Sequence, residues 1–184
     1  GFGIKNNRNP DQRGGVAGRP PLSPWFVCLT MVLCKRVVNN MSHSFSNLNV
    51  HLIFHTKSGT CIMDESDLAR VFRYIGGLIH SLSGYAYIVG GRPDHIHILT
   101  TLPLTKSVSD FVREIKANTS RWIKGIDTKY HHFAWQEGYG VFSVSESNKA
   151  SVINYILKQE EHHRQYSAQE EFNIFLCKHG LQKE

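Results

Sequence analysis

Apolar and polar positions follow two different periods along this chain, and together they predict its elements. Alternating or short apolar runs predict strands over 48–56, 85–89, 95–101 and 133–144, with a turn over 90–94. Apolar positions spaced i, i+3, i+4 and i+7 predict helices over 64–83 and 107–124, and further helices are expected over 147–165 and 167–179. This order of elements is typical of a ferredoxin-like or RRM-like α+β fold, in which helices pack on one face of an antiparallel sheet.

Length and composition are those of a single globular domain. The chain has 184 residues, of which 41% are hydrophobic and 20% charged. Most of the net charge of +6 lies in residues 1–40, where Asp11 is the single acid. The remainder is almost neutral, so a surface that binds nucleic acid must be a local patch. Arg113, Lys116 and Arg121 on the helix over 107–124 could form one, although such a face is more often solvated.

Residues 1–40 are rich in Gly, Pro and Arg and show neither helical nor strand periodicity. We interpret them as a disordered or non-native extension before a natural start at Met41; a basic arm that touches DNA is the alternative. The apolar stretch over 25–34 is too short to span a membrane, and Lys35 and Arg36 follow where a signal peptide would have small residues. The four cysteines show no paired spacing, which predicts free thiols in a reducing cytoplasm.

Two histidines, His95 and His97, stand two residues apart in the third predicted strand. Alternate side chains of a strand share a face, so the imidazoles project together while the neighbouring isoleucines face a core. Such a pair supplies two ligands of a facial metal site; a strand cap and a half-exposed histidine are the alternative. On the first strand His51 and His55 also share a face, and there histidines are usually packing residues.

Tyr155 and Gln159 lie four residues apart in the helix over 147–165, hence on one face and one turn from each other. Two imidazole nitrogens and the amide oxygen of Gln159 could hold a divalent cation, Mg²⁺ or Mn²⁺, with positions open to phosphate oxygens. The metal would polarise a phosphate, and the phenol of Tyr155 would attack its phosphorus. Because a phenol with a pKa of about 10 is a reasonable leaving group, a DNA 3′-hydroxyl can reverse the link. A half-buried helix tyrosine and a surface glutamine are the alternative.

Three motifs resemble those of one family. They are His95-Ile96-His97, Trp135-Gln136-x-Gly138-Tyr139-Gly140-x-Phe142-Ser143-Val144 and Tyr155-Ile156-x-x-Gln159-x-x-His162-His163. In this order and spacing, over residues 44–163, they resemble the HUH single-tyrosine transposases of the insertion-sequence "two hundred" type, whose elements move as single-stranded DNA. A transposase domain over residues 41–184 is therefore expected.

The resemblance implies roles for four residues. His95, His97 and Gln159 would be the metal ligands, and Tyr155 the nucleophile that forms a 5′-phosphotyrosine link. The resemblance also implies a homodimer in which the tyrosine helix of one subunit lies against the histidine strand of the other. The substrate would be a DNA hairpin near the element's end, with cleavage and rejoining of an adjacent single strand.

Two other functions would use some of the same features. A non-catalytic regulator that binds hairpin DNA or RNA would keep the fold but has no need of all four site residues. A histidine-triad nucleotide hydrolase would need a third histidine where the chain has Leu99. The metal-dependent transposase is therefore the leading hypothesis. His162 and His163 match the family pattern, either as support for the metal ligands or as structural residues.

Overall fold

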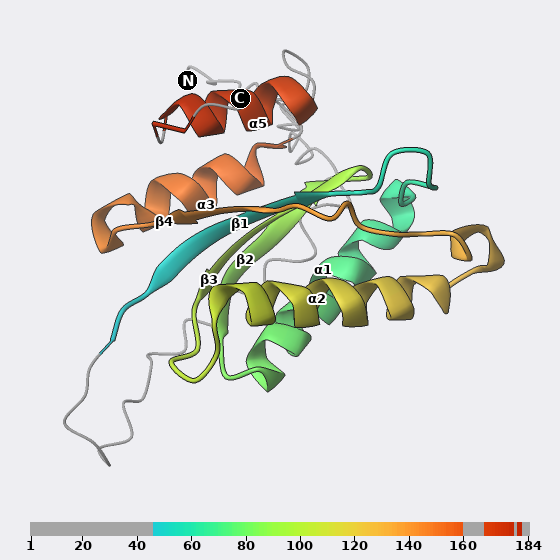
Figure 1. Ribbon diagram of the computed structural model, residues 1–184, viewed down its shortest axis with the longest axis horizontal. Helices are drawn as coiled ribbons and strands as arrows, with labels where there is room; N and C mark the ends of the chain where they lie inside the picture. The colour runs from blue at the N-terminus through green and yellow to red at the C-terminus, as the bar shows by residue number, and fades with distance from the viewer. Residues whose placement is uncertain (1–45, 160–167, 179, 182–184) are drawn as a thin grey trace, which may run out of the picture.

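The computed structural model describes residues 46–159, 168–178, 180 and 181 (Figure 1). Its strands and helices are β1 (Asn49–His55), α1 (Glu65–Ser81), β2 (Tyr85–Arg92), β3 (His95–Thr101), α2 (Val108–Lys124), β4 (Gly140–Ser143), α3 (Lys149–Leu157) and α5 (Ala168–Lys178). The predicted order of elements is confirmed. None of the helices within these ranges is long and apolar enough to cross a membrane. The predictions for residues 1–40 and for His162 and His163 lie outside the described residues.

The strands form one antiparallel sheet in the order β2-β3-β1-β4. In the central pair, the register places Ile53 of β1 opposite His97 of β3, and His55 opposite His95. Every residue of β3 is buried, as are all residues of β1 except the last. The predicted α+β fold with an antiparallel sheet is confirmed, and both faces of its central strands are covered.

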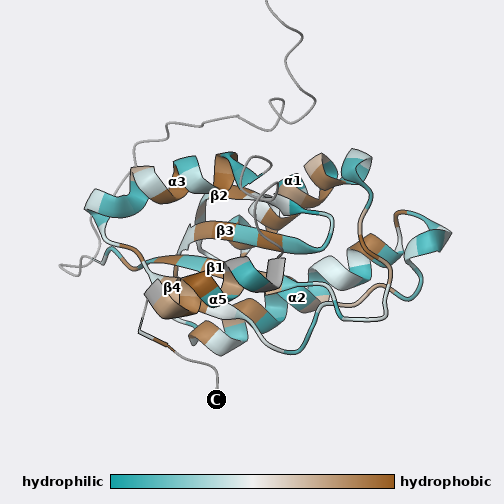
Figure 2. Cartoon of the chain, turned by 90° about the horizontal axis from the view of Figure 1, so that it is seen from above, coloured by the Kyte–Doolittle hydropathy of each residue, from teal (hydrophilic) through white to brown (hydrophobic). Residues whose placement is uncertain are grey.

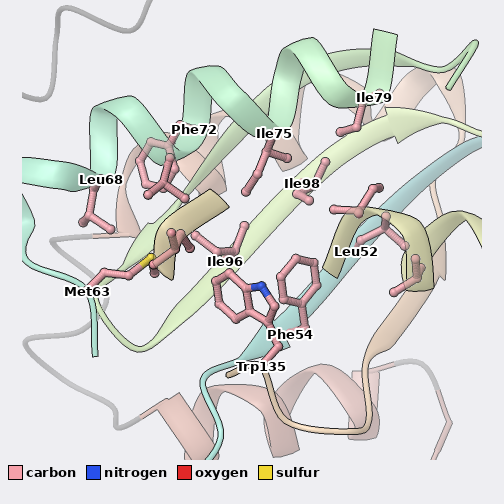
Figure 3. Close-up of a cluster of buried hydrophobic side chains, with 14 of the residues drawn as sticks. Leu52, Phe54, Met63, Leu68, Phe72, Ile75, Ile79, Ile96, Ile98 and Trp135 are labelled. Atoms are coloured by element: carbon pink, nitrogen blue, oxygen red, sulfur yellow. The ribbon is translucent and has the colours of Figure 1, made fainter. Parts of the chain in front are cut away.

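One face of the sheet carries the main hydrophobic core. Figure 3 shows Leu52, Phe54, Ile96 and Ile98 on this face, below the buried side chains of α1. The two long helices contribute apolar stripes to it: Leu68, Val71, Phe72, Ile75 and Ile79 from α1, and Phe111, Val112, Ile115 and Ile123 from α2. Each such side chain stabilises the fold by about 1.5–3 kcal/mol relative to exposure. This core fixes β1 and β3, and with them the side chains on the other face.

The other face of the sheet lies under α3 and α5. Figure 2 looks onto this side of the molecule, with α3 beside β2 and α5 over β1 and β4. From α5, the ring centroid of Phe172 is 5.7 Å from that of His55, and the centroid of Phe175 is 5.1 Å from that of His51. The predicted packing of helices on one face holds for α1 and α2, whereas α3 and α5 cover the opposite face.

The fourth strand is shorter than predicted. Of the range 133–144, only Gly140–Ser143 forms β4, and Trp135 makes a single bridge to Thr56. The intervening segment is held elsewhere, because Nζ of Lys116 in α2 donates hydrogen bonds of 2.6, 3.0 and 3.0 Å to the carbonyl oxygens of Gln136, Glu137 and Gly138. The backbone N–H of Gln136 still donates to the carbonyl oxygen of His55 in β1 at 3.0 Å, so a side chain of α2 takes the place of a strand partner only at the carbonyl oxygens.

Candidate active site

Four histidines lie together on the face of the sheet that α3 and α5 cover. His95 and His97 come from β3, as the alternation along that strand predicts, and each is 1% exposed. His51 and His55 come from β1, with ring centroids 5.2 Å from that of His97 and 5.4 Å from that of His95, respectively. Burying polar rings is costly unless their nitrogens have partners. The contacts of these nitrogens therefore define the site.

Two glycines lie at the end of β2, and the first of them lets α3 pack closely on this face. Gly90 and Gly91 pair with β3, so the prediction that they belong to the turn is wrong. A Cβ atom on Gly90 would lie only 2.6 Å from Cγ2 of Ile156 in α3. Gly91 has a φ of +144°, a conformation that side chains larger than glycine rarely adopt. Gly90 thus stands where α3 meets β2, whereas Gly91 stands where the backbone of β3 approaches, since a Cβ atom there would lie 2.3 Å from the carbonyl oxygen of His95.

The α3 segment brings Tyr155 and Gln159 to the histidines. Gln159 follows the last turn of this helix, which is shorter than the predicted range 147–165 in the part of the chain described. Oε1 of Gln159 lies 3.3 Å from Nε2 of His95, and Gln159 is 3% exposed. The ring centroid of Tyr155 is 5.8 Å from that of His97. The structure therefore brings together the four side chains predicted to carry the chemistry.

Both histidines of β3 have Nδ1 engaged by a neighbouring side chain. Nδ1 of His95 donates to Oδ1 of Asp94 at 2.7 Å. Nδ1 of His97 lies 3.0 Å from Nε2 of His51, and the tautomers decide which nitrogen donates. Such contacts fix the planes of metal-binding imidazoles in other sites, and here they leave Nε2 as the atom at which a metal would bind.

Neither Asp94 nor His51 is among the predicted site residues. The sequence alone could have pointed to Asp94, because a carboxylate directly before a histidine in a strand can reach the imidazole ring. For His51 no local signal exists, since its contact with His97 depends on the pairing of β1 with β3. His51 is buried, as expected of a packing residue, and it also contacts a candidate metal ligand.

The donor set fits a divalent metal ion. Within the described part of the chain, no group of three or more His, Cys, Asp or Glu side chains is arranged to hold one. The candidate set differs because its third donor is an amide oxygen. Nε2 of His95 lies 3.3 Å from Oε1 of Gln159, and a neutral ring that donates from Nδ1 to Asp94 would present its Nε2 lone pair beside this oxygen. A cation bound to Nε2 of His95 and to Oε1 of Gln159 would take a lone pair from each of these hydrogen-bond acceptors. Mg²⁺ and Mn²⁺ both bind ligand atoms of these kinds.

The residues predicted to bind nucleic acid lie on α2, across the sheet from the histidines (Figure 1). Arg113 and Arg121 are exposed, and Arg113 forms an ion pair of 2.7 Å with Asp110. Lys116 is held by the three carbonyls before β4, and burial lowers its pKa below the usual value. Arg113 and Lys116 line a cavity of about 350 Å³ between α2 and the segment before β4. The structure does not bring these residues into the histidine site.

The fold and this site define a class of protein: a ferredoxin-like domain whose buried site combines two strand histidines with a helix tyrosine and a glutamine. A family model described as "Transposase IS200 like" matches residues 44–159. The chain belongs to this family, which confirms the predicted resemblance to transposases of the insertion-sequence "two hundred" type. DNA transposition, with cleavage and transfer of strands, is therefore its class of activity.

The solved structures that are similar to this chain include two transposases. One is a Deinococcus radiodurans R1 protein assigned as a transposase, with 19% identity and a TM-score of 0.49 over 64% of this chain and 95% of the other. The second is a REP-associated tyrosine transposase bound to a REP hairpin, with 16% identity and a TM-score of 0.49 over 67% of this chain and 74% of the other. No curated protein matches the sequence.

Proposed function

We propose that the protein is a metal-dependent transposase that cleaves and rejoins single-stranded DNA through a covalent bond to Tyr155. The observation that carries the proposal is the meeting of side chains from two elements: His95 and His97 from β3, with Tyr155 and Gln159 from the α3 segment. A protein that only bound DNA would not need two histidines, an amide and a phenol in one buried cluster. Membership of the IS200-like family supports the same function.

His95, His97 and Gln159 would hold the metal ion, Mg²⁺ or Mn²⁺. When bound, the ion supplies Lewis-acid polarisation of the scissile phosphate. Asp94 and His51 hold the two imidazoles in one orientation, so the ligand atoms are arranged before the ion binds. The histidines are 1% exposed and Gln159 is 3% exposed, so their surroundings exclude bulk water. Exclusion of water favours transfer of the phosphate to DNA over its hydrolysis.

Tyr155 would act as the nucleophile. Its phenol oxygen forms a bond to phosphorus while the bond from phosphorus to the 3′ oxygen of the preceding nucleotide breaks. The leaving strand ends in a 3′-hydroxyl, which takes up a proton equivalent to the one that the phenol loses. The 5′ phosphate stays on Tyr155, and attack by a DNA 3′-hydroxyl reverses the step and releases the tyrosine.

The proposed partner is a DNA hairpin at the element's end together with the single strand beside it. Arg113 and Arg121 stay proposed backbone contacts because their guanidinium groups are exposed, whereas Lys116 is already held by carbonyls. The homodimer implied by the family resemblance stays a prediction. Cys61 and Cys177, the cysteines within the described residues, form no disulfide with each other, and the cytoplasmic location stays a prediction.

A gel assay for a covalent protein–DNA adduct tests this function. Single-stranded oligonucleotides from both flanks of the coding region are incubated with the protein and Mg²⁺ or Mn²⁺, and adducts that resist SDS are counted. We expect an adduct that disappears with EDTA and with Tyr155→Phe, because the phenol oxygen makes the bond. Hairpin binding by Tyr155→Phe should equal that of the unaltered protein.

Tyr74→Phe is the matched control, because the ring of this tyrosine in α1 stacks on Trp122 and lies outside the histidine site. It should form the adduct at the rate of the unaltered protein. Hairpin binding without any adduct on the correct flanks would favour a non-catalytic DNA-binding regulator. An adduct that persists in Tyr155→Phe would assign the nucleophile to another residue.

A further inference from the structure

We propose that a cavity beside Tyr155 binds one unstacked DNA base next to the scissile phosphate, an inference that rests on the proposed strand-transfer function. The cavity has a volume of about 290 Å³ and lies between β4, α3 and α5. His51 and Phe142, both buried, line its inner part, and Tyr155 and Phe175, both half-buried, line its sides. The cavity therefore reaches from the surface to the imidazole that contacts His97.

Aromatic rings surround the cavity. The ring centroid of Phe175 lies 5.1 Å from that of His51, 5.3 Å from that of Tyr155 and 5.5 Å from that of Phe142. Unpaired bases stack on aromatic side chains, and this contact tolerates any base because every base has a π face. The chemistry of the lining therefore suits a flat aromatic ligand.

The polarity of the lining selects a base over a phosphate group. Among the described residues that line the cavity, none is charged, and the exposed ones are Ser143, Asn148 and Ser151. Hydroxyl and amide groups can exchange hydrogen bonds with the edge of a base, but they supply no cation for a phosphate. A volume of about 290 Å³ is at the lower limit of ligand pockets, which leaves room for one base and excludes a run of nucleotides.

The position of the cavity indicates which base would enter it. Tyr155 lines the cavity and is also the proposed nucleophile. A strand whose phosphate lies at the phenol oxygen has the bases of the two adjoining nucleotides closest to this cavity. One of them, turned out of the stack, would enter the cavity and lie against the aromatic rings that line it. Such a contact would place the scissile phosphate and would make cleavage depend on that one base.

Two matched variants test the cavity. Ser151→Trp places a large ring at its mouth, whereas Ala150→Trp places the same ring on an exposed position of α3 that does not line it. Substrates carry an abasic site at each nucleotide near the cut in turn, and the rate of adduct formation is measured. With the unaltered protein, one abasic position beside the cut should slow the reaction by about tenfold. Ser151→Trp should be slow on intact DNA and insensitive to that position, and Ala150→Trp should behave as the unaltered protein.

A second measurement does not depend on chemistry. Tyr155→Phe is mixed with oligonucleotides that carry the fluorescent base 2-aminopurine at each position in turn. At one position, stacking on the aromatic rings of the cavity should quench the fluorescence of this base. Phe175→Leu, which removes a ring but keeps apolar bulk, should weaken the quenching even if Ser151→Trp proves unstable. An adduct that forms at equal rates with every abasic substrate, or the absence of any quenched position, would overturn the cavity proposal while leaving strand transfer intact. Quenching without any adduct would instead retain the cavity and reject the strand-transfer function.

Discussion

The imidazole of His51 connects two parts of the candidate site at the scale of single residues. Its Nε2 atom lies 3.0 Å from Nδ1 of His97, and its ring centroid is 6.3 Å from that of Tyr155. His51 is 1% exposed, so water cannot readily replace this contact. We therefore interpret His51 as a positioning residue that fixes the plane of the His97 ring and is not itself a metal ligand.

Substitution of His51 should change metal affinity according to the hydrogen bond that the new side chain can form. His51→Phe keeps a ring but removes the partner of Nδ1 of His97, so we expect Mn²⁺ to bind about 10–100-fold more weakly. His51→Gln can place an amide group near the former position of Nε2, and it should retain most of the affinity. Titration calorimetry or the electron paramagnetic resonance of Mn²⁺, both without DNA, measures the difference.

The control for this experiment is His80→Phe, because His80 is exposed in the last turn of α1. It should bind Mn²⁺ as the unaltered protein does. If the Phe and Gln variants of His51 had the same metal affinity, the hydrogen bond to His97 would have no role in binding. His51 would then be a packing residue only, as its place on a central strand suggests.

At the scale of elements, the crossing of α3 over β2 depends on the missing side chain of Gly90. A Cβ atom there would lie 2.6 Å from Cγ2 and 3.3 Å from the carbonyl oxygen of Ile156. The backbone oxygen can move only with the helix, so Gly90→Ala should shift α3 and displace Tyr155 and Gln159. We expect a loss of about 1–3 kcal/mol in the free energy of unfolding and a larger relative loss of covalent adduct.

Denaturant unfolding and the adduct assay together measure the effect of Gly90→Ala. Gly138→Ala is the control, since a Cβ atom on Gly138 would meet nothing within 4 Å. Adding Ile156→Ala to Gly90→Ala removes the clashing Cγ2 atom and should restore part of the adduct. A Gly90→Ala variant with normal stability and normal adduct yield would show that the close approach of α3 is unnecessary.

The sequence predicted elements well where a local pattern decides the structure. Alternation along β3 puts His97 and Ile98 on opposite faces, and helical spacing turns the apolar stripes of α1 and α2 to the core. Gln159 lies beyond the end of α3 at Leu157, so the spacing within that helix does not by itself place it beside His95. The predicted ends of the elements were wrong where contacts between residues distant in the sequence determine the structure. Gly90 reads locally as a turn residue, yet it extends β2 because it pairs with His97 of β3. For the same reason, the contribution of His51 follows only from the pairing of two strands that are distant in sequence.

At the scale of the whole molecule, the sheet separates a layer that stabilises the fold from a layer that carries the chemistry. α1 and α2 bury apolar stripes on one face, and the candidate ligands lie on the other (Figures 1 and 3). On that second face α3 packs against β2 and β3 of its own chain. The four candidate side chains therefore meet within a single chain here, and the helix exchanged between two subunits, which the family resemblance implies, stays a prediction.

A mixing experiment distinguishes a site within one chain from a site shared between two. Tyr155→Phe lacks the nucleophile, and His97→Ala lacks a metal ligand, so each variant alone should form no adduct. If one chain supplies every group, each site in a mixture still carries one defect, and we expect no recovery. If two subunits exchanged α3, about half of the dimers in an equal mixture would contain one chain of each variant. In such a dimer one of the two sites would combine an intact tyrosine with intact histidines. The mixture would then form about a quarter of the adduct that the unaltered protein forms. Mixing Tyr155→Phe with the unaltered protein is the control, and the adduct yield should be proportional to the share of unaltered chains. Recovery of adduct from the mixture of the two defective variants would contradict a site formed within one chain.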